Sequence, residues 1–195
     1  MSGELIRFLH ASDFHLEQPL YGLTSVPEHL RELVLDGPYL AATRVFDNAI
    51  LEHVDFVVLS GDILDPLHAG PRALAFLLEQ FERLRERDIR VYWAGGQLDS
   101  PDAWPATVPL PSNVRLFQTS RLEERTHIRD EQSQATLMGI SWSDRLRIHP
   151  SEFRGDGGER EGAEEFHRKS ALACAADPVK NRSVLQARSD GLSER

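Results

Sequence analysis

Two short buried-strand patterns, with a helical segment between them, place the strongest constraint on the fold of this chain. The first, Phe56–Ser60, is followed by Gly61 and Asp62, and the second, Arg90–Ala94, is followed by two glycines. Residues 72–87 lie between them and carry leucines and a phenylalanine at helical spacing, with arginines and glutamates on the opposite face. This strand–helix–strand order predicts an α/β layered fold.

The remaining patterns extend this prediction on both sides. Residues 5–11 form a short apolar run that ends in a polar turn, which predicts a strand, and residues 40–53 place apolar side chains on one helical face. Three further strands are expected at residues 114–117, 126–129 and 135–141, without long helices between them. Alternation followed by clustered strands favours a layered fold with a mixed sheet.

A change in composition near Ser143 divides the chain into two expected parts. Residues 1–143 contain 21 acidic and 12 basic residues and hold all three tryptophans, whereas residues 144–195 contain ten of each charge. The stretch 154–162 is rich in glycine and charge and has no apolar periodicity. We therefore expect a folded domain over residues 1–143 and a weakly ordered tail over 144–195, with one marginal helix at 163–176.

Composition excludes several classes of function. The formal net charge of −9 does not attract nucleic acid by bulk electrostatics, so DNA binding needs a local patch or bound cations. The single cysteine, Cys174, excludes an intramolecular disulfide and a cysteine-rich zinc site. Apolar runs are too short to span a bilayer, and the N-terminus does not resemble a secretory signal, so we expect a cytoplasmic protein without membrane contact.

Polar residues follow each of the first three expected strands. Asp13 and His15 come after the first strand, Asp62 after the second, and Gly96-Gln97-Leu98-Asp99 after the third. In open α/β sheets, ligands bind at the carboxyl ends of the strands. Asp13 and His15 are two residues apart, so in an extended segment their side chains point the same way. A carboxylate and an imidazole that converge there suit a metal ion, and Asp62 is placed to bridge two cations.

Each of these signals is weak when taken alone. An Asp-x-His triplet is common by chance, Gly61-Asp62 is an ordinary turn sequence, and a loop histidine such as His15 is more often hydrogen-bonded than metal-bound. The order of the three signals, and their common place after strands, favours the metal site.

Three segments carry a resemblance to a known family: residues 8–16 (FLHASDFHL), 55–65 (DFVVLSGDILD) and 94–101 (AGGQLDSP). Together they resemble the calcineurin-like metallophosphoesterases, and within them the SbcD-type DNA-repair exonucleases, over roughly residues 5–142. The resemblance implies a sandwich of two mixed β-sheets flanked by helices, here incomplete at its C-terminal side. It also implies a hydrolase that cleaves phosphodiester bonds with a two-metal centre, usually of manganese.

The resemblance assigns roles to particular residues. Asp13 and His15 match the ligands of one metal, and Asp62 matches the bridging carboxylate. Gln97 stands where the family has an asparagine ligand, and we expect Asp65 and Asp99 to support the ligands from behind. The implied substrate is a nucleic acid, and the family's usual partner is a coiled-coil ATPase.

The chain also departs from the family pattern. Leu98 stands at the position of a histidine that steadies the transition state and helps to protonate the leaving group, which leucine cannot do. The family's later Gly-His-x-His element is absent, and His149 and His167 lack its flanking sequence. Two explanations stay open: a shortened or frame-disrupted version of a longer enzyme, or a divergent relative that keeps the fold as a binding or scaffold protein. In either case the chain is expected to hold one or two divalent cations and to be impaired as a catalyst.

Overall fold

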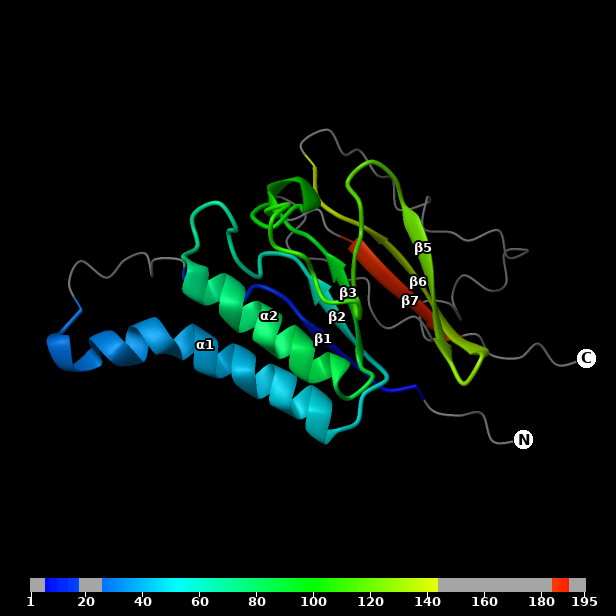
Figure 1. The fold of residues 1–195 in the computed structure, drawn as a ribbon, viewed down its shortest axis with the longest axis horizontal. Coiled ribbons are helices and arrows are strands. Elements are labelled where there is room, and N and C mark those ends of the chain that lie inside the picture. Colours follow the sequence, from blue (N-terminus) through cyan, green and yellow to red (C-terminus); the bar gives the residue numbers. More distant parts are fainter. Residues whose placement is uncertain (1–5, 18–25, 144–183, 190–195) are drawn as a thin grey trace, which may run out of the picture.

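The computed structural model describes residues 6–17, 26–143 and 184–189, which form two α-helices, one short 3-10 helix and seven strands (Figure 1). In chain order they are β1 (Phe8–Ala11), α1 (Glu28–Leu51), β2 (Phe56–Ser60), α2 (Pro71–Arg85), β3 (Arg90–Ala94), η1 (Pro101–Ala103), β4 (Val114–Leu116), β5 (Glu123–Arg129), β6 (Gln132–Ile140) and β7 (Val184–Ser189).

The first four strands form a parallel sheet in the order β1-β2-β3-β4. Residues on opposite faces of β2 and β3 enter two different cores. One face, with Val57, Leu59 and Trp93, packs against α1 and α2, and the other face, with Phe56 and Tyr92, packs against the second sheet. Burial on both faces explains why these two strands read as continuous apolar runs in the sequence.

The second sheet is antiparallel, in the order β5-β6-β7, with a bulge between His127 and Ile128. Its inner face contributes Ala135 and Leu137 to the core that it shares with the parallel sheet. The layers are therefore helices, parallel sheet and antiparallel sheet, and Figure 1 shows α1 and α2 on one side of β1–β3 with β5–β7 on the other. This arrangement confirms the predicted α/β layered class.

Three details differ from the sequence prediction. Among the described strands, parallel and antiparallel pairings are segregated into two sheets and are not mixed within one. Helix α1 begins twelve residues before the predicted start at residue 40, because it continues through Gly37 and Pro38, a pair that is typical of a helix boundary. Strand β7 pairs with β6 although it lies in the expected tail, whereas the expected helix at 163–176, His149, His167 and Cys174 lie outside the described residues.

The division into a domain over 1–143 and a tail over 144–195 stays a prediction. Among the described helices, neither is both long enough and apolar enough to cross a membrane.

Candidate metal centre

The loops that follow β1 and β2 run side by side and bring the predicted ligands together. The backbone N–H of Asp13 donates to the carbonyl of Gly61 at 3.0 Å, and that of His15 donates to the carbonyl of Asp62 at 3.0 Å. Leu16 and Leu64 then form a parallel bridge beyond the ends of the two strands. The parallel pairing thus extends past the sheet and places residues 13–16 against residues 61–64.

Asp13, His15 and Asp62 converge at this edge. Each offers one ligand atom, and these atoms lie within 4.8 Å of one another. The Nε2 atom of His15 is 3.6 Å from Oδ1 of Asp13, and both side chains are partly exposed. The structure therefore brings together three of the four residues that the sequence nominated as metal ligands.

All three residues have a left-handed backbone, with φ of 57° at Asp13, 47° at His15 and 54° at Asp62. This conformation costs about 1–2 kcal/mol for a residue with a side chain, although aspartate adopts it more readily than most. Strain of this kind is retained at functional sites when the surrounding structure enforces it. Three strained residues with convergent ligand groups favour a binding site over an ordinary turn.

The donor set fits a hard divalent cation. Two carboxylates and one imidazole are ligands that manganese and iron accept, and no thiolate is present among the three. The Nδ1 atom of His15 is buried and has no hydrogen-bond partner among the described residues, so this polar atom lacks the compensation that buried groups ordinarily have.

Gln97 lies at the exposed tip of the loop after β3, next to the partly buried Leu98. The backbone N–H of Leu98 donates to Oδ1 of Asp62 at 3.1 Å. Residue 98, where the resemblance to the family leads us to expect a histidine, thus contacts the cluster through its backbone. Its leucine side chain supplies neither a proton nor a ligand there.

The two residues expected to support the ligands have different surroundings. Asp65 lies in the turn before α2, where its carboxylate is 2.7 Å from Nδ1 of His68 and accepts the N–H of Leu67. Asp99 is 1% exposed and accepts four hydrogen bonds, three from the loops after β2 and β3 and one from Trp93 in β3. Burial raises the pKa of Asp99 to about 6, although the backbone donors oppose that shift.

Sequence reasoning missed two contributors. Glu17, also left-handed, accepts hydrogen bonds from the Tyr39 hydroxyl at 2.7 Å and from the N–H of Gly70 at 2.5 Å, so it ties the end of the first loop to both helices. Gly96 makes room for a ligand, because a β-carbon at this position would lie 2.5 Å from Oδ1 of Asp62. No sequence pattern indicates the role of Glu17. The role of Gly96 is indicated only by the presence of a glycine at that position.

Two residues near the cluster, Trp93 and His10, have structural roles. The Trp93 side chain is fully buried and contacts Phe81 and Trp104 in tilted and edge-on ring geometry. The Nε2 atom of His10 lies 2.6 Å from the hydroxyl oxygen of Ser60, and burial lowers the pKa of His10. Trp93 is therefore not accessible to a substrate, and the ring of His10 is partly buried beside Ser60.

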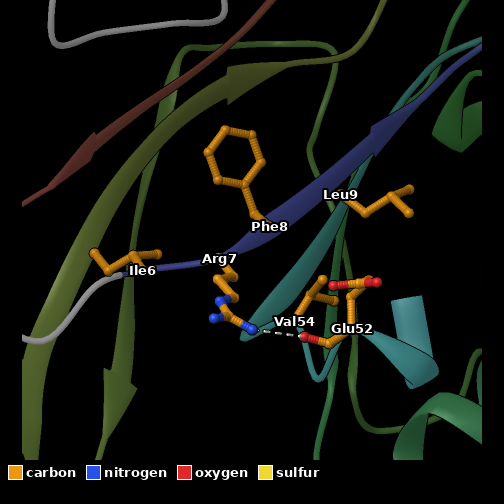
Figure 2. A pocket seen from close by; sticks show the side chains of 6 residues that line it. All are labelled: Ile6, Arg7, Phe8, Leu9, Glu52 and Val54. Atoms are coloured by element: carbon orange, nitrogen blue, oxygen red, sulfur yellow. Dashed lines mark hydrogen bonds between the residues drawn. The ribbon is translucent and has the colours of Figure 1, made fainter. Parts of the chain in front are cut away.

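A hollow of about 400 Å³ lies at the opposite end of β1 and is drawn in Figure 2. It is lined by Ile6, Arg7, Phe8, Leu9, Glu52 and Val54, and Arg7 donates across it to the carbonyl of Glu52. The ligand cluster is at the carboxyl ends of the strands, so this hollow is not part of it.

Comparison with known proteins identifies the family of the chain. A sequence profile of the family described as calcineurin-like phosphoesterase matches residues 6–158. An uncharacterised metallophosphoesterase, YhaO of Bacillus subtilis, is 34% identical over 140 residues, which cover 72% of this chain and 34% of that protein. The DNA double-strand break repair protein Mre11 of Sulfolobus acidocaldarius is 31% identical over 96 residues, 49% of this chain and 23% of that protein.

Mre11 of Sulfurisphaera tokodaii is 31% identical over 103 residues, which cover 53% of this chain and 24% of that protein. The chain thus spans about a third of the length of YhaO and about a quarter of the length of the two Mre11 proteins.

Proposed function

Because the chain belongs to the calcineurin-like phosphoesterase family, we propose that it is a metal-dependent phosphodiesterase of the DNA-repair nuclease type. The observation that carries the proposal is the convergence of Asp13, His15 and Asp62 at the carboxyl edge of the parallel sheet, each with a strained backbone. The named function of the Mre11 relatives, DNA double-strand break repair, supports a nucleic acid as the substrate class.

In this proposal Asp13, His15 and Asp62 hold a divalent cation, for which manganese is the expected identity. Bound divalent cations supply Lewis-acid activation of water and of a phosphoryl oxygen. The carboxylates bring negative charge to an edge that must also accept a phosphodiester anion, so occupancy by a cation is a condition for substrate binding. The net charge of −9 strengthens that condition.

A second candidate function is a non-catalytic relative that binds DNA or a protein partner. The observation that favours it is Leu98, whose backbone lies beside Asp62 but whose side chain cannot act as a general acid. The coiled-coil ATPase partner and the cytoplasmic location rest on the resemblance and on composition, and both stay predictions.

The test is a calorimetric titration of the purified chain with manganese, followed by hydrolysis of bis-p-nitrophenyl phosphate and of single- and double-stranded DNA. We expect manganese binding by the wild-type chain and a loss of binding in Asp62→Asn. Metal binding with slow, metal-dependent hydrolysis supports the phosphodiesterase. Metal binding without any hydrolysis supports the non-catalytic relative, and no metal binding contradicts both metal-based interpretations.

A further inference from the structure

We infer that Asp99 is a positioning residue that fixes the carboxylate of Asp62 for metal binding, by holding the loops after β2 and β3 together. The inference rests on the proposed function, because it concerns the same site. It adds a residue that is not itself a proposed metal ligand and that acts through the backbone of Asp62 and its neighbours.

The backbone turns sharply directly after β2. Gly61 and Asp62 have φ of 85° and 54°, so two consecutive residues are left-handed. In such a turn, successive N–H groups point into one concavity that attracts an anion. Here the anion is the side chain of Asp99: the N–H of Asp62 donates to its Oδ1 at 2.9 Å, and the N–H of Ile63 donates to its Oδ2 at 3.1 Å.

Strand β3 and the loop after it supply the other two donors to Asp99. Oδ1 of Asp99 also accepts the N–H of Gly96 at 2.6 Å, and Oδ2 also accepts the indole Nε1–H of Trp93 at 3.0 Å. Each oxygen therefore takes one donor from the β2 loop and one from β3 or the loop that follows it. Because Asp99 is 1% exposed, water cannot replace these bonds.

The consequence falls on the Asp62 side chain. The loop that Asp99 closes presents the N–H of Leu98 to Oδ1 of Asp62 and leaves space for that oxygen beside Gly96. Without Asp99, both loops lose the anion that joins them, and the left-handed turn at Asp62 loses the contacts that offset its strain. The carboxylate then samples other orientations, which weakens any cation held between it, Asp13 and His15.

The experiment compares Asp99→Asn with Val57→Ala in metal binding and in a metal-free measurement. Asparagine keeps the size of the side chain but replaces one acceptor oxygen with an NH₂ group, which cannot accept the two donors on that side. Val57 is a buried residue of β2 that packs toward the helices, so Val57→Ala lowers stability without touching these loops. We expect Asp99→Asn to raise the dissociation constant for manganese roughly 10- to 100-fold and Val57→Ala to leave it unchanged.

In the metal-free wild type, the amide protons of Asp62, Ile63 and Gly96 are expected to exchange slowly with solvent. In Asp99→Asn they should exchange faster, while the amides of α2 keep their protection. The Trp93 indole proton should also shift in the NMR spectrum. Trp93→Phe removes one donor and keeps the three backbone donors, so it should weaken manganese binding less than Asp99→Asn does.

Unchanged manganese affinity in Asp99→Asn, with a wild type that binds the metal, would overturn the inference and leave the proposed function intact. Fast exchange of the three amides in the wild type would overturn it even if Asp99→Asn does not fold. A wild type that binds no manganese would instead overturn the proposed function, and the inference with it.

Discussion

The carboxylate of Asp62 fills the space that a side chain on residue 96 would need. A β-carbon built on Gly96 would lie 2.5 Å from Asp62 Oδ1 and 2.7 Å from the Asp62 backbone nitrogen. Both distances are shorter than a non-bonded contact allows, so glycine at position 96 is a condition for the observed orientation of Asp62.

This contact predicts the behaviour of Gly96→Ala. The added methyl group forces the Asp62 carboxylate or its loop to move, and we expect manganese affinity to fall by roughly 10- to 100-fold. Gly37→Ala is the control, because a β-carbon at Gly37 meets nothing within 4 Å. Calorimetry with both variants checks the prediction, and equal affinities in the two variants would contradict it.

Asp13→Asn should separate stability from metal binding. Asp13 and Asp62 place two carboxylates within 4.8 Å, and in the metal-free protein these like charges repel. Asparagine tolerates the left-handed backbone of residue 13, so the variant's metal-free melting temperature should equal or exceed that of the wild type. The rise in melting temperature on adding manganese should be smaller than in the wild type.

The matched control is Asp47→Asn, which removes a carboxylate that pairs with Arg83 between α1 and α2. Its response to manganese should match that of the wild type. A full manganese response in Asp13→Asn would argue against Asp13 as a ligand.

The chain is expected to bind at most one divalent cation tightly and to hydrolyse phosphodiesters far more slowly than an intact family member. Among the described residues, Asp13, His15 and Asp62 form one three-ligand group, and Gln97 is exposed at the loop tip. Loss of a general acid at position 98 typically costs about 10²- to 10⁴-fold in rate. Leu98→His should restore little, because the second cation would still be missing.

Manganese stoichiometry and turnover of the wild type and Leu98→His test this expectation. Two tightly bound ions per chain, or turnover equal to that of an intact relative, would show that other residues complete the site.

His127 should make the folded state sensitive to acid. His127 is buried between the sheets, and its Nδ1 atom lies 3.2 Å from the Tyr92 hydroxyl. Burial lowers the pKa of His127. Arg90 and Arg129 act in the same direction, and Asp55 opposes them. A folded-state pKa below the unfolded value of 6.5 means that the neutral form is favoured by folding. The contribution of neutral His127 to the stability of the folded state is present above pH 6.5 and is lost as the pH falls through the folded-state pKa.

The measurement is thermal unfolding of the wild type and His127→Asn at pH 7.5 and 5.5. The wild type should lose more stability on acidification than the variant does. The pKa of Asp99 is raised and acts in the opposite sense, but it is present in both proteins, so the difference reports His127. An equal loss of stability in the two proteins would show that His127 does not contribute to the acid sensitivity.

Local sequence patterns predict the elements whose pattern and final burial agree. Phe56–Ser60 and Arg90–Ala94 were predicted with their observed bounds, because strands buried on both faces require continuous apolar residues. The placement of Asp13, His15 and Asp62 after parallel strands also followed from the pattern, since the carboxyl ends of such strands meet at one edge.

The contacts that hold this edge form only in the folded protein. Leu16 pairs with Leu64, and Glu17 is anchored to Tyr39 and Gly70. Four donors converge on Asp99, and these contacts join residues that lie 3 to 53 positions apart in the chain. β7 likewise forms through pairing with β6 across a long separation. A local pattern records which residues favour a strand or a turn, but a hydrogen bond between distant loops exists only after the sheet has brought them together. The sequence therefore nominated the ligands, and the fold selected the residues that orient them.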